Sequence, residues 1–327
     1  MNNFKKIGLT ALAASLVSVS ANAGEMTVSG AASLAVEGFS GEQLDAGKGY
    51  TMGNQLTFSG SGELDNGLTV SLSFVQDNAE QTFDSHSLTI SSDTLGTIKF
   101  MGEGGSTTTN AIDGTAAGDI WDKFDGLTNA MVLGTHGIGA TTDSNTATAG
   151  DNAFIYTSPE LMEGLTATLS YAPQASGAET RASGTGVGVN YTGIEGLTLA
   201  YAKADIVNST KALSGDQTVM EASYAYGPVT VAYSKWESDV DTANKDMEVS
   251  SVALSYTVSD ELSLTYGMEE MDYEGSSTDA EYESVSVSYV TGGMTITAGM
   301  HEAENANFGT ASNQDIEKWT LGASFAF

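Results

Sequence analysis

From about residue 25 to the C-terminus, apolar and small polar residues alternate along the chain. In the segment 68–74, the even positions are Leu, Val, Leu and Phe, and the odd positions are Thr or Ser. The same alternation recurs in the segments 165–171, 197–201, 229–233, 262–266, 294–300 and 318–327. A strand with this pattern has one apolar face and one polar face. The sequence therefore predicts an all-β protein.

The connections between these segments alternate in length. Tight turns rich in Gly, Pro, Asn and Asp lead directly into the next segment, as Asn66-Gly67 leads into Leu68. The connections between the turns are longer and polar. This spacing predicts sixteen strands, seven short turns and eight long loops. The predicted strands cover residues 25–37, 50–64, 68–76, 82–92, 96–103, 151–159, 164–173, 184–192, 196–204, 217–227, 228–237, 246–258, 261–271, 281–291, 293–302 and 316–327.

Two architectures fit strands with one apolar face: a soluble sandwich and a membrane barrel. The polar faces carry Ser, Thr, Gly and Ala instead of Lys, Glu and Arg, which favours a watery lumen. An even number of strands, with short turns on one side and long loops on the other, is typical of outer-membrane barrels. A propeller would need one tryptophan motif per blade, and the three Trp show no such period. We therefore predict a 16-stranded antiparallel transmembrane β-barrel with short periplasmic turns and long extracellular loops.

The N-terminal segment has the pattern of a secretory signal peptide. Lys5 and Lys6 precede a short apolar stretch, and an Ala-x-Ala cleavage site ends at Ala23. A transmembrane anchor is the alternative, but the stretch is too short to span a bilayer. We therefore expect residues 1–23 to direct export through the Sec pathway and residues 24–327 to form the barrel.

The chain is strongly acidic, with 42 acidic and 11 basic residues and a formal charge of −31. A nucleic-acid partner is excluded, because phosphate binding needs a basic surface. The absence of Cys excludes disulfides and thiol or Cys-zinc chemistry. Acidic composition can also indicate disorder, but 40% of the residues are apolar, which favours a folded chain.

Motifs of catalysis are absent. The sequence has no G-x-S-x-G, HExxH or P-loop motif, and its only histidines are His86, His136 and His301. Some outer-membrane barrels are hydrolases, and His301 with Glu302 or Glu304 could mimic their catalytic pair. A histidine at a loop rim beside acids is more often simply solvated, so we predict that the protein is not an enzyme.

In combination, four features resemble the Gram-negative bacterial porin family, the 16-stranded general diffusion porins, and its alphaproteobacterial type. They are the signal peptide, the segment 65–74, the Gly-Thr-Ile-Lys-Phe-Met-Gly strand at 96–102, and the aromatic C-terminal strand at 319–327. The resemblance implies a homotrimer in the outer membrane, in contact with lipid and lipopolysaccharide. It also implies a water-filled channel for passive diffusion of ions and small hydrophilic solutes.

The resemblance assigns further roles. A third loop, here about residues 103–150, folds into the barrel and narrows the pore. The terminal aromatics Phe325 and Phe327 are similar to the signal that the barrel assembly machinery reads. Family members usually carry an arginine cluster on the wall facing this loop, whereas the only arginine here is Arg181. This difference argues against a strong transverse field at the constriction.

The third loop carries the charges that could set ion preference, because charges at a constriction select ions. These candidate pore charges are Asp113, Asp119, Asp122, Lys123 and Asp125. The alternative is that they simply solvate an exposed loop.

Apolar residues could anchor the same loop. Trp121 and Phe124 are three residues apart and would share one face of a helical turn. That apolar face would fix the loop to the wall and leave its acids to the pore.

Strand parity predicts which charges face the lumen. Lys99, Glu221 and Lys318 each alternate with apolar neighbours, so they should point inward, and Arg181 joins them as a wall candidate. The alternative is a rim position without a special role, particularly for Lys318.

Most acids are assigned to the long loops, and the lipid-facing strand positions are expected to be nearly free of charge. Oxygen clusters of this kind attract divalent cations, so a weak structural Ca²⁺ or Mg²⁺ site is one hypothesis, although solvated loops are the favoured interpretation. Its candidate ligands are Glu270, Asp272, Glu274, Asp239 and Asp241.

The negative vestibule should enrich cations. We therefore predict a cation-preferring diffusion channel, with a non-conducting surface barrel, either an adhesin or an outer-membrane hydrolase, as the alternative.

Overall fold

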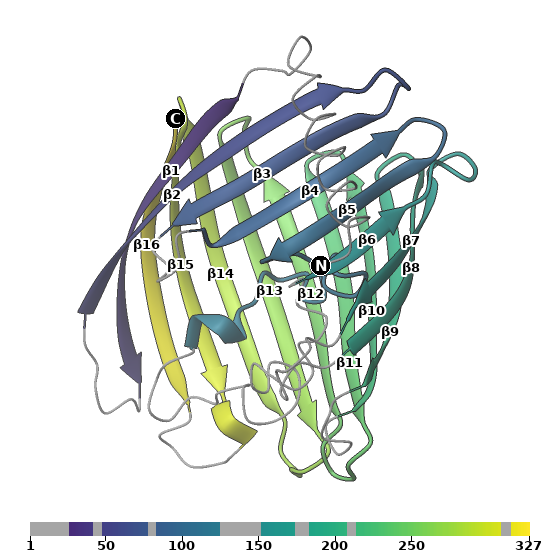
Figure 1. The fold of residues 1–327 in the computed structure, drawn as a ribbon. Coiled ribbons are helices and arrows are strands. Elements are labelled where there is room, and N and C mark those ends of the chain that lie inside the picture. Colours follow the sequence, from purple (N-terminus) through teal and green to yellow (C-terminus); the bar gives the residue numbers. More distant parts are fainter. Residues whose placement is uncertain are drawn as a thin grey trace.

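The computed structural model describes residues 26–41, 48–77, 83–124, 152–173, 183–207, 214–308 and 315–327. Their sixteen strands form one closed antiparallel barrel, in which each strand pairs with its sequence neighbours and β1 pairs with β16 (Figure 1). The strands are β1 (Thr27–Gly41), β2 (Lys48–Glu63), β3 (Thr69–Asp77), β4 (Ser85–Ser92), β5 (Gly96–Glu103), β6 (Ala153–Thr157), β7 (Leu165–Ala172), β8 (Ser183–Ile194), β9 (Leu197–Val207), β10 (Gly215–Tyr226), β11 (Val229–Val240), β12 (Met247–Thr257), β13 (Leu262–Tyr273), β14 (Ala280–Thr291), β15 (Met294–Glu304) and β16 (Ile316–Ala326).

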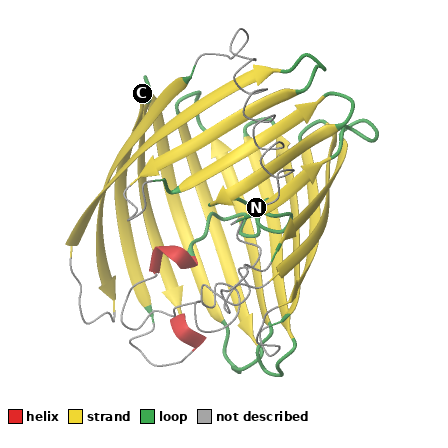
Figure 2. Cartoon of the chain, viewed as in Figure 1, coloured by secondary structure: helices red, strands yellow, loops and turns green. Residues whose placement is uncertain are grey.

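Two short 3₁₀ helices, η1 (Trp121–Phe124) and η5 (Ala306–Phe308), are the helical elements described (Figure 2). Among the described residues, no helix is long and apolar enough to cross a bilayer.

The predicted fold class and strand order are confirmed. Seven short turns join the strands at the end of the barrel where the C-terminus lies, which we call the turn end (Figure 1). Gly196 shows why glycine recurs in these turns: its φ is +78°, and a Cβ there would lie 2.3 Å from the carbonyl oxygen of Ala225. The other strand ends lie at the opposite end of the barrel, which we call the loop end. The predicted signal peptide, residues 1–23, lies outside the described residues.

Toward the turn end, the outer face of the barrel is apolar and the inner face is small and polar. Leu72, Phe100 and Leu254 are outward and exposed, whereas Ser71 and Thr89 are inward. The outer face is the surface that a bilayer would cover, because a lipid-facing strand position must be apolar.

Toward the loop end of β12–β16 the two faces exchange polarity. Along β13, Met271 and Tyr273 are inward and buried, whereas Glu270 and Asp272 are outward and exposed. The same reversal occurs on the neighbouring strands. Outward acids are Glu248, Glu281, Glu283, Glu302, Glu304 and Glu317, and inward apolar residues are Met247, Val249, Ala280, Tyr282, Ala303 and Ile316.

This reversal corrects the expectation that outward strand positions are nearly free of charge. Many acids that were assigned to loops lie on strands, because β11 extends to Val240 and β13 to Tyr273. Above the bilayer the outer face meets water, so acids are stable there. The inner face is covered by chain and can therefore be apolar.

Candidate functional site: a loop fastened to the inner wall

The connection after β5 turns into the barrel and follows its inner wall. We call its described part, residues 104–124, the inner loop; residues 125–151 lie outside the described residues. The loop first contacts β7, where Thr108 is hydrogen-bonded to Ser170, and then β10, where Thr109 donates to Gln217. It continues across β11–β14 and ends against β16. The loop therefore lines more than half of the wall.

Serine side chains fasten the middle of the inner loop. Ser234 Oγ on β11 accepts a 2.6 Å hydrogen bond from the N–H of Ala116, and Ser251 Oγ on β12 accepts one of 2.8 Å from the N–H of Ala117. Both serines are fully buried. A loop packed on a wall must satisfy its backbone N–H groups, and small hydroxyl residues do so without pushing the loop away.

Wall glycines make room for this close approach. A Cβ at Gly186 would lie 1.9 Å from Thr108 Oγ1, and one at Gly267 would lie 2.7 Å from Ala117 Cβ. Distances this short do not occur between real atoms, so these positions are glycine because the loop covers them.

We expect Gly267→Ala to displace the inner loop toward the lumen, because the added methyl overlaps the Ala117 Cβ. Overpacking of this kind costs about 1–3 kcal/mol. Single-channel recording should show a smaller conductance. The control is Gly60→Ala on β2, where an added Cβ meets nothing within 4 Å. Equal conductance in the two variants would contradict the interpretation.

Apolar side chains anchor the end of the loop. Ile120 and Phe124 are fully buried, and Trp121 packs against the same cluster. The ring of Phe124 lies 5.9 Å from that of Tyr282 on β14. Trp121 and Phe124 are the anchor residues predicted from the sequence. Ile120 was not predicted, although it is an apolar residue directly before Trp121.

A buried carboxylate holds the start of η1. Glu269 on β13 is 2% exposed, and its Oε2 accepts a 3.1 Å hydrogen bond from the N–H of Trp121. Ser251 Oγ lies 3.4 Å from its other oxygen. A carboxylate is favourable at a helix start, where N–H groups lack partners. No sequence motif around Glu269 indicated this role.

The acids of the inner loop stay on its exposed side. Asp113, Asp119 and Asp122 are exposed, and Asp113 lies close enough to Glu221 on β10 for their charges to repel. Lys123 donates a 3.4 Å hydrogen bond to the carbonyl oxygen of Gly118. Asp125 lies outside the described residues. The three described loop carboxylates are thus exposed, and one of them lies near a carboxylate of the wall.

The predicted wall cations have different surroundings. Lys99 on β5 is on the inner face, paired across strands with Thr89 and Ile155. Lys318 on β16 is 2.8 Å from Glu37 on β1, an interaction that the sequence analysis missed. Arg181 lies outside the described residues.

The wall of β1–β4, away from the inner loop, is rich in hydroxyl groups, and Lys99 on the adjacent β5 lies opposite Thr89. A recess of about 300 Å³ opens on it, formed by β1–β4. The recess is lined by Thr27, Ser59, Gly60, Ser61, Ser71, Leu72, Ser73, Ser87 and Thr89. The lumen is therefore asymmetric, with carboxylates on the loop side and hydroxyl groups opposite.

His301 is part of the inner wall and not of a rim. It is buried, and its two ring nitrogens are hydrogen-bonded to Ser284 and Thr320 at 2.8 and 3.0 Å. Glu302 and Glu304 are on the outer face of the same strand. The structure therefore corrects both earlier interpretations of His301: it is neither a solvated residue nor paired with these acids.

Comparison with known proteins shows which family a barrel with this inner loop belongs to. The family model of Gram-negative porins matches residues 8–327. The chain belongs to the Gram-negative porin family. It is thus an outer-membrane channel for passive diffusion and not an enzyme. No curated protein sequence matches the chain.

Solved porin structures share the fold at low sequence identity. A loop-L8 deletion mutant of Vibrio cholerae OmpT has a TM-score of 0.70 at 15% identity, covering 93% of this chain and 99% of that chain. The anion-selective porin from Comamonas acidovorans has a TM-score of 0.67 at 14% sequence identity, and the match covers 93% of this chain and 99% of that chain. A trimer form of Vibrio cholerae OmpT has a TM-score of 0.64 at 12% sequence identity, and the match covers 94% of this chain and 100% of that chain.

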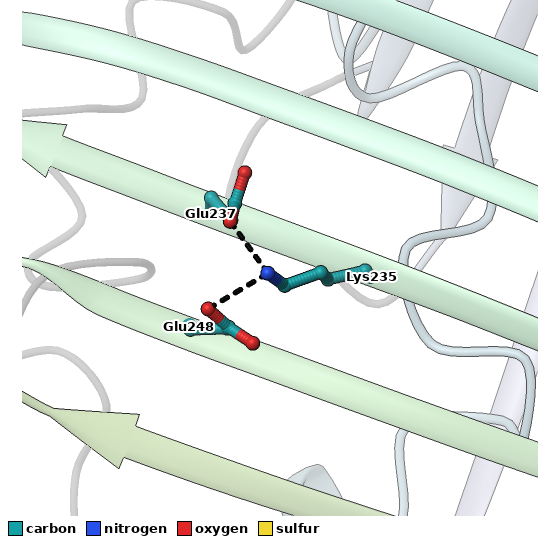
Figure 3. Close-up of polar contacts among 3 residues, drawn as sticks. All are labelled: Lys235, Glu237 and Glu248. Atoms are coloured by element: carbon teal, nitrogen blue, oxygen red, sulfur yellow. Dashed lines mark hydrogen bonds and ion pairs between the residues drawn. The ribbon is translucent and has the colours of Figure 1, made fainter.

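On the outer face of this porin, two lysines sit among the acids at the loop end. Lys235 Nζ lies 2.6 Å from Glu237 and 2.9 Å from Glu248 on the adjacent strand (Figure 3). Lys203 is paired with Asp216 at 2.8 Å. These pairs relieve part of the repulsion between neighbouring outward acids.

The candidate cation ligands are spread over this region of the porin. Glu270 and Asp272 are outward on β13, Asp239 is outward on β11, and Asp241 and Glu274 follow the ends of these strands. Among the residues that the structure describes, no group of three or more acids or histidines could hold a metal ion. The weak divalent site stays a prediction.

The C-terminal aromatics of the porin are exposed on its outer face. Phe325 is on β16, and the backbone of Phe327 exchanges hydrogen bonds of 2.7 and 3.0 Å with Gly30. Their recognition by the assembly machinery stays a prediction.

Proposed function

We propose that this porin prefers cations and that its inner loop forms the constriction. The observation that carries the proposal is the asymmetric lumen. Asp113, Asp119 and Asp122 are exposed on the loop, while the opposite wall offers hydroxyl groups. Charges that line a narrow passage set its ion preference.

Among the described inner cations, Lys99 on β5 opposes these acids, whereas two others offset them weakly. Lys318 is neutralised by its ion pair with Glu37, and Lys123 lies on the loop beside Asp122. The Comamonas relative is named an anion-selective porin although its fold is similar. The fold is therefore compatible with either preference, and the lumen charges decide between them.

The test is the reversal potential of the refolded protein in a planar bilayer with a KCl gradient. We expect the sign given by K⁺ permeating faster than Cl⁻. The opposite sign would refute the cation preference while leaving the channel function intact.

We also propose that the chain forms a homotrimer, which is supported by the trimer form of its Vibrio cholerae relative. Cross-linking in mild detergent should give a three-subunit band; a band at one subunit only would contradict it. Contact with lipopolysaccharide, membership of the alphaproteobacterial type and Sec export stay predictions. Export is checked by sequencing the mature N-terminus, which should begin at Gly24.

A further inference from the structure

One lysine joins three separate parts of the barrel. Lys318 belongs to β16, and its ammonium group donates a hydrogen bond to the carbonyl oxygen of Lys123 in η1. The same group lies 2.8 Å from Glu37 Oε2 on β1 and 5.1 Å from the ring centroid of Phe39. The side chain is only 9% exposed. Its charge therefore faces protein groups and not the water of the pore.

The position of this lysine is significant because β1 and β16 are the first and last strands. Their pairing closes the barrel, with Phe39 opposite Lys318 and Glu37 opposite Thr320. Lys318 thus connects the closure seam to the downstream end of the inner loop. The loop contacts along β7–β13 hold its upstream part, and Phe124 packs in the apolar cluster that includes Phe39 and Ile316. The bond to Lys123 is the polar attachment at the seam.

We propose that Lys318 is a positioning residue that latches the inner loop to the closure seam, so that the pore narrows fully only when the first and last strands are paired. This inference rests on the proposed role of the inner loop as the constriction. An ammonium group suits the task because it has three donors and no acceptor, and it can bind a carboxylate and a carbonyl together. Glu37 supplies the charge that keeps the ammonium group buried.

Two competing roles make different predictions. If Lys318 only staples β16 to β1, any ion pair at the seam can replace it. If it only contributes positive charge to the lumen, removing Lys99 has a comparable effect. A latch instead requires a hydrogen-bond donor aimed at the Lys123 carbonyl, whatever the charge of the side chain.

The test compares four variants of the full-length refolded protein in planar bilayers. Lys318→Met removes both charge and donor, whereas Lys318→Gln removes the charge but keeps a donor. The pair Glu37→Lys with Lys318→Glu restores the ion pair without a donor to the loop. Lys99→Met is the matched loss of an inner lysine.

We expect open-channel current noise to rise severalfold in Lys318→Met and in the swapped pair, because a released loop end fluctuates in the pore. Lys318→Gln should stay near the original noise, and Lys99→Met should shift only the reversal potential. The double variant Glu37→Lys with Lys318→Glu should recover the thermal stability of the original protein, but its open-channel current noise should stay high. If Lys318→Met fails to fold, the swapped pair decides alone.

The proposal is overturned if Lys318→Met and Lys99→Met behave alike, or if the swapped pair restores quiet current. Either result would leave the cation preference untouched, because that is measured separately as the sign of the reversal potential. An anion preference with a noisy Lys318→Met channel would refute the proposed selectivity and support the latch.

Discussion

Replacing Phe124 with alanine is expected to raise the single-channel conductance by releasing the inner loop from the wall. Phe124 is 1% exposed and packs against Tyr282 in the apolar cluster of β12–β16. Truncating a buried phenylalanine to alanine costs about 3–5 kcal/mol. A cost of about 3 kcal/mol shifts the ratio of undocked to docked loop by on the order of a hundredfold.

The controls separate loop release from general destabilisation. Phe124→Leu keeps much of the buried volume and should conduct nearly like the original protein. Phe83→Ala removes a 40% exposed phenylalanine that is not part of this cluster and should leave the conductance unchanged. Conductance in Phe124→Ala equal to that of the original protein would show that this anchor does not hold the constriction.

Neutralising the three loop acids together, Asp113→Asn with Asp119→Asn and Asp122→Asn, is expected to abolish most of the cation preference. A unit charge about 10 Å from a permeating ion in water is worth about 0.4 kcal/mol, with opposite signs for cations and anions. Three such charges, screened at about 0.1 M salt, change the cation-to-anion permeability ratio by roughly fivefold. Reversal potentials measured at increasing salt should show the effect shrinking.

The matched control removes the same charge from the outer face. Glu281, Glu283 and Glu302 are outward and exposed, so changing all three to glutamine alters the net charge equally without altering the lumen. This control should shift the reversal potential much less. Equal shifts in the two triple variants would mean that selectivity follows the overall charge, and the inner loop would lose its assigned role.

The exchange of polarity along β12–β16 explains how the outer face of one acidic chain can be apolar where a bilayer would cover it and charged where it meets water. Below the exchange, residues such as Leu254 face outward, where a bilayer would cover them. Above it, Glu248 faces outward while Val249 packs inward. Net charge alone therefore says little about the pore, because the outward acids are separated from the lumen by the barrel wall.

The strands and their faces could be predicted from the sequence because strand periodicity is local. Alternation in the segment 68–74 fixes which residues share a face, whatever the partner strand is. The same argument put Lys99 and Glu221 on one face and their apolar neighbours on the other. Strand ends were predicted less well at the loop end, since β11 and β13 continue into segments whose charged residues suggested loops.

The inner-loop attachments could not be predicted because they join residues distant in sequence. Glu269 binds the backbone of Trp121 at a separation of 148 residues, and Lys318 binds that of Lys123 at a separation of 195. No local pattern distinguishes Ser251, which holds the loop, from Ser250, which faces outward on the same strand. Such roles follow from which strands come together around the lumen.

The sequence by itself determined the number, order and facing of the strands, because a period of two is a property of the local backbone and its solvent. Only the tertiary structure decided what each face contacts. It placed water outside and protein inside at the loop end, and this reversed the polarity of β12–β16. It also brought Glu37 and Lys318 together by closing the barrel, because the first and last strands become neighbours only when all sixteen have paired.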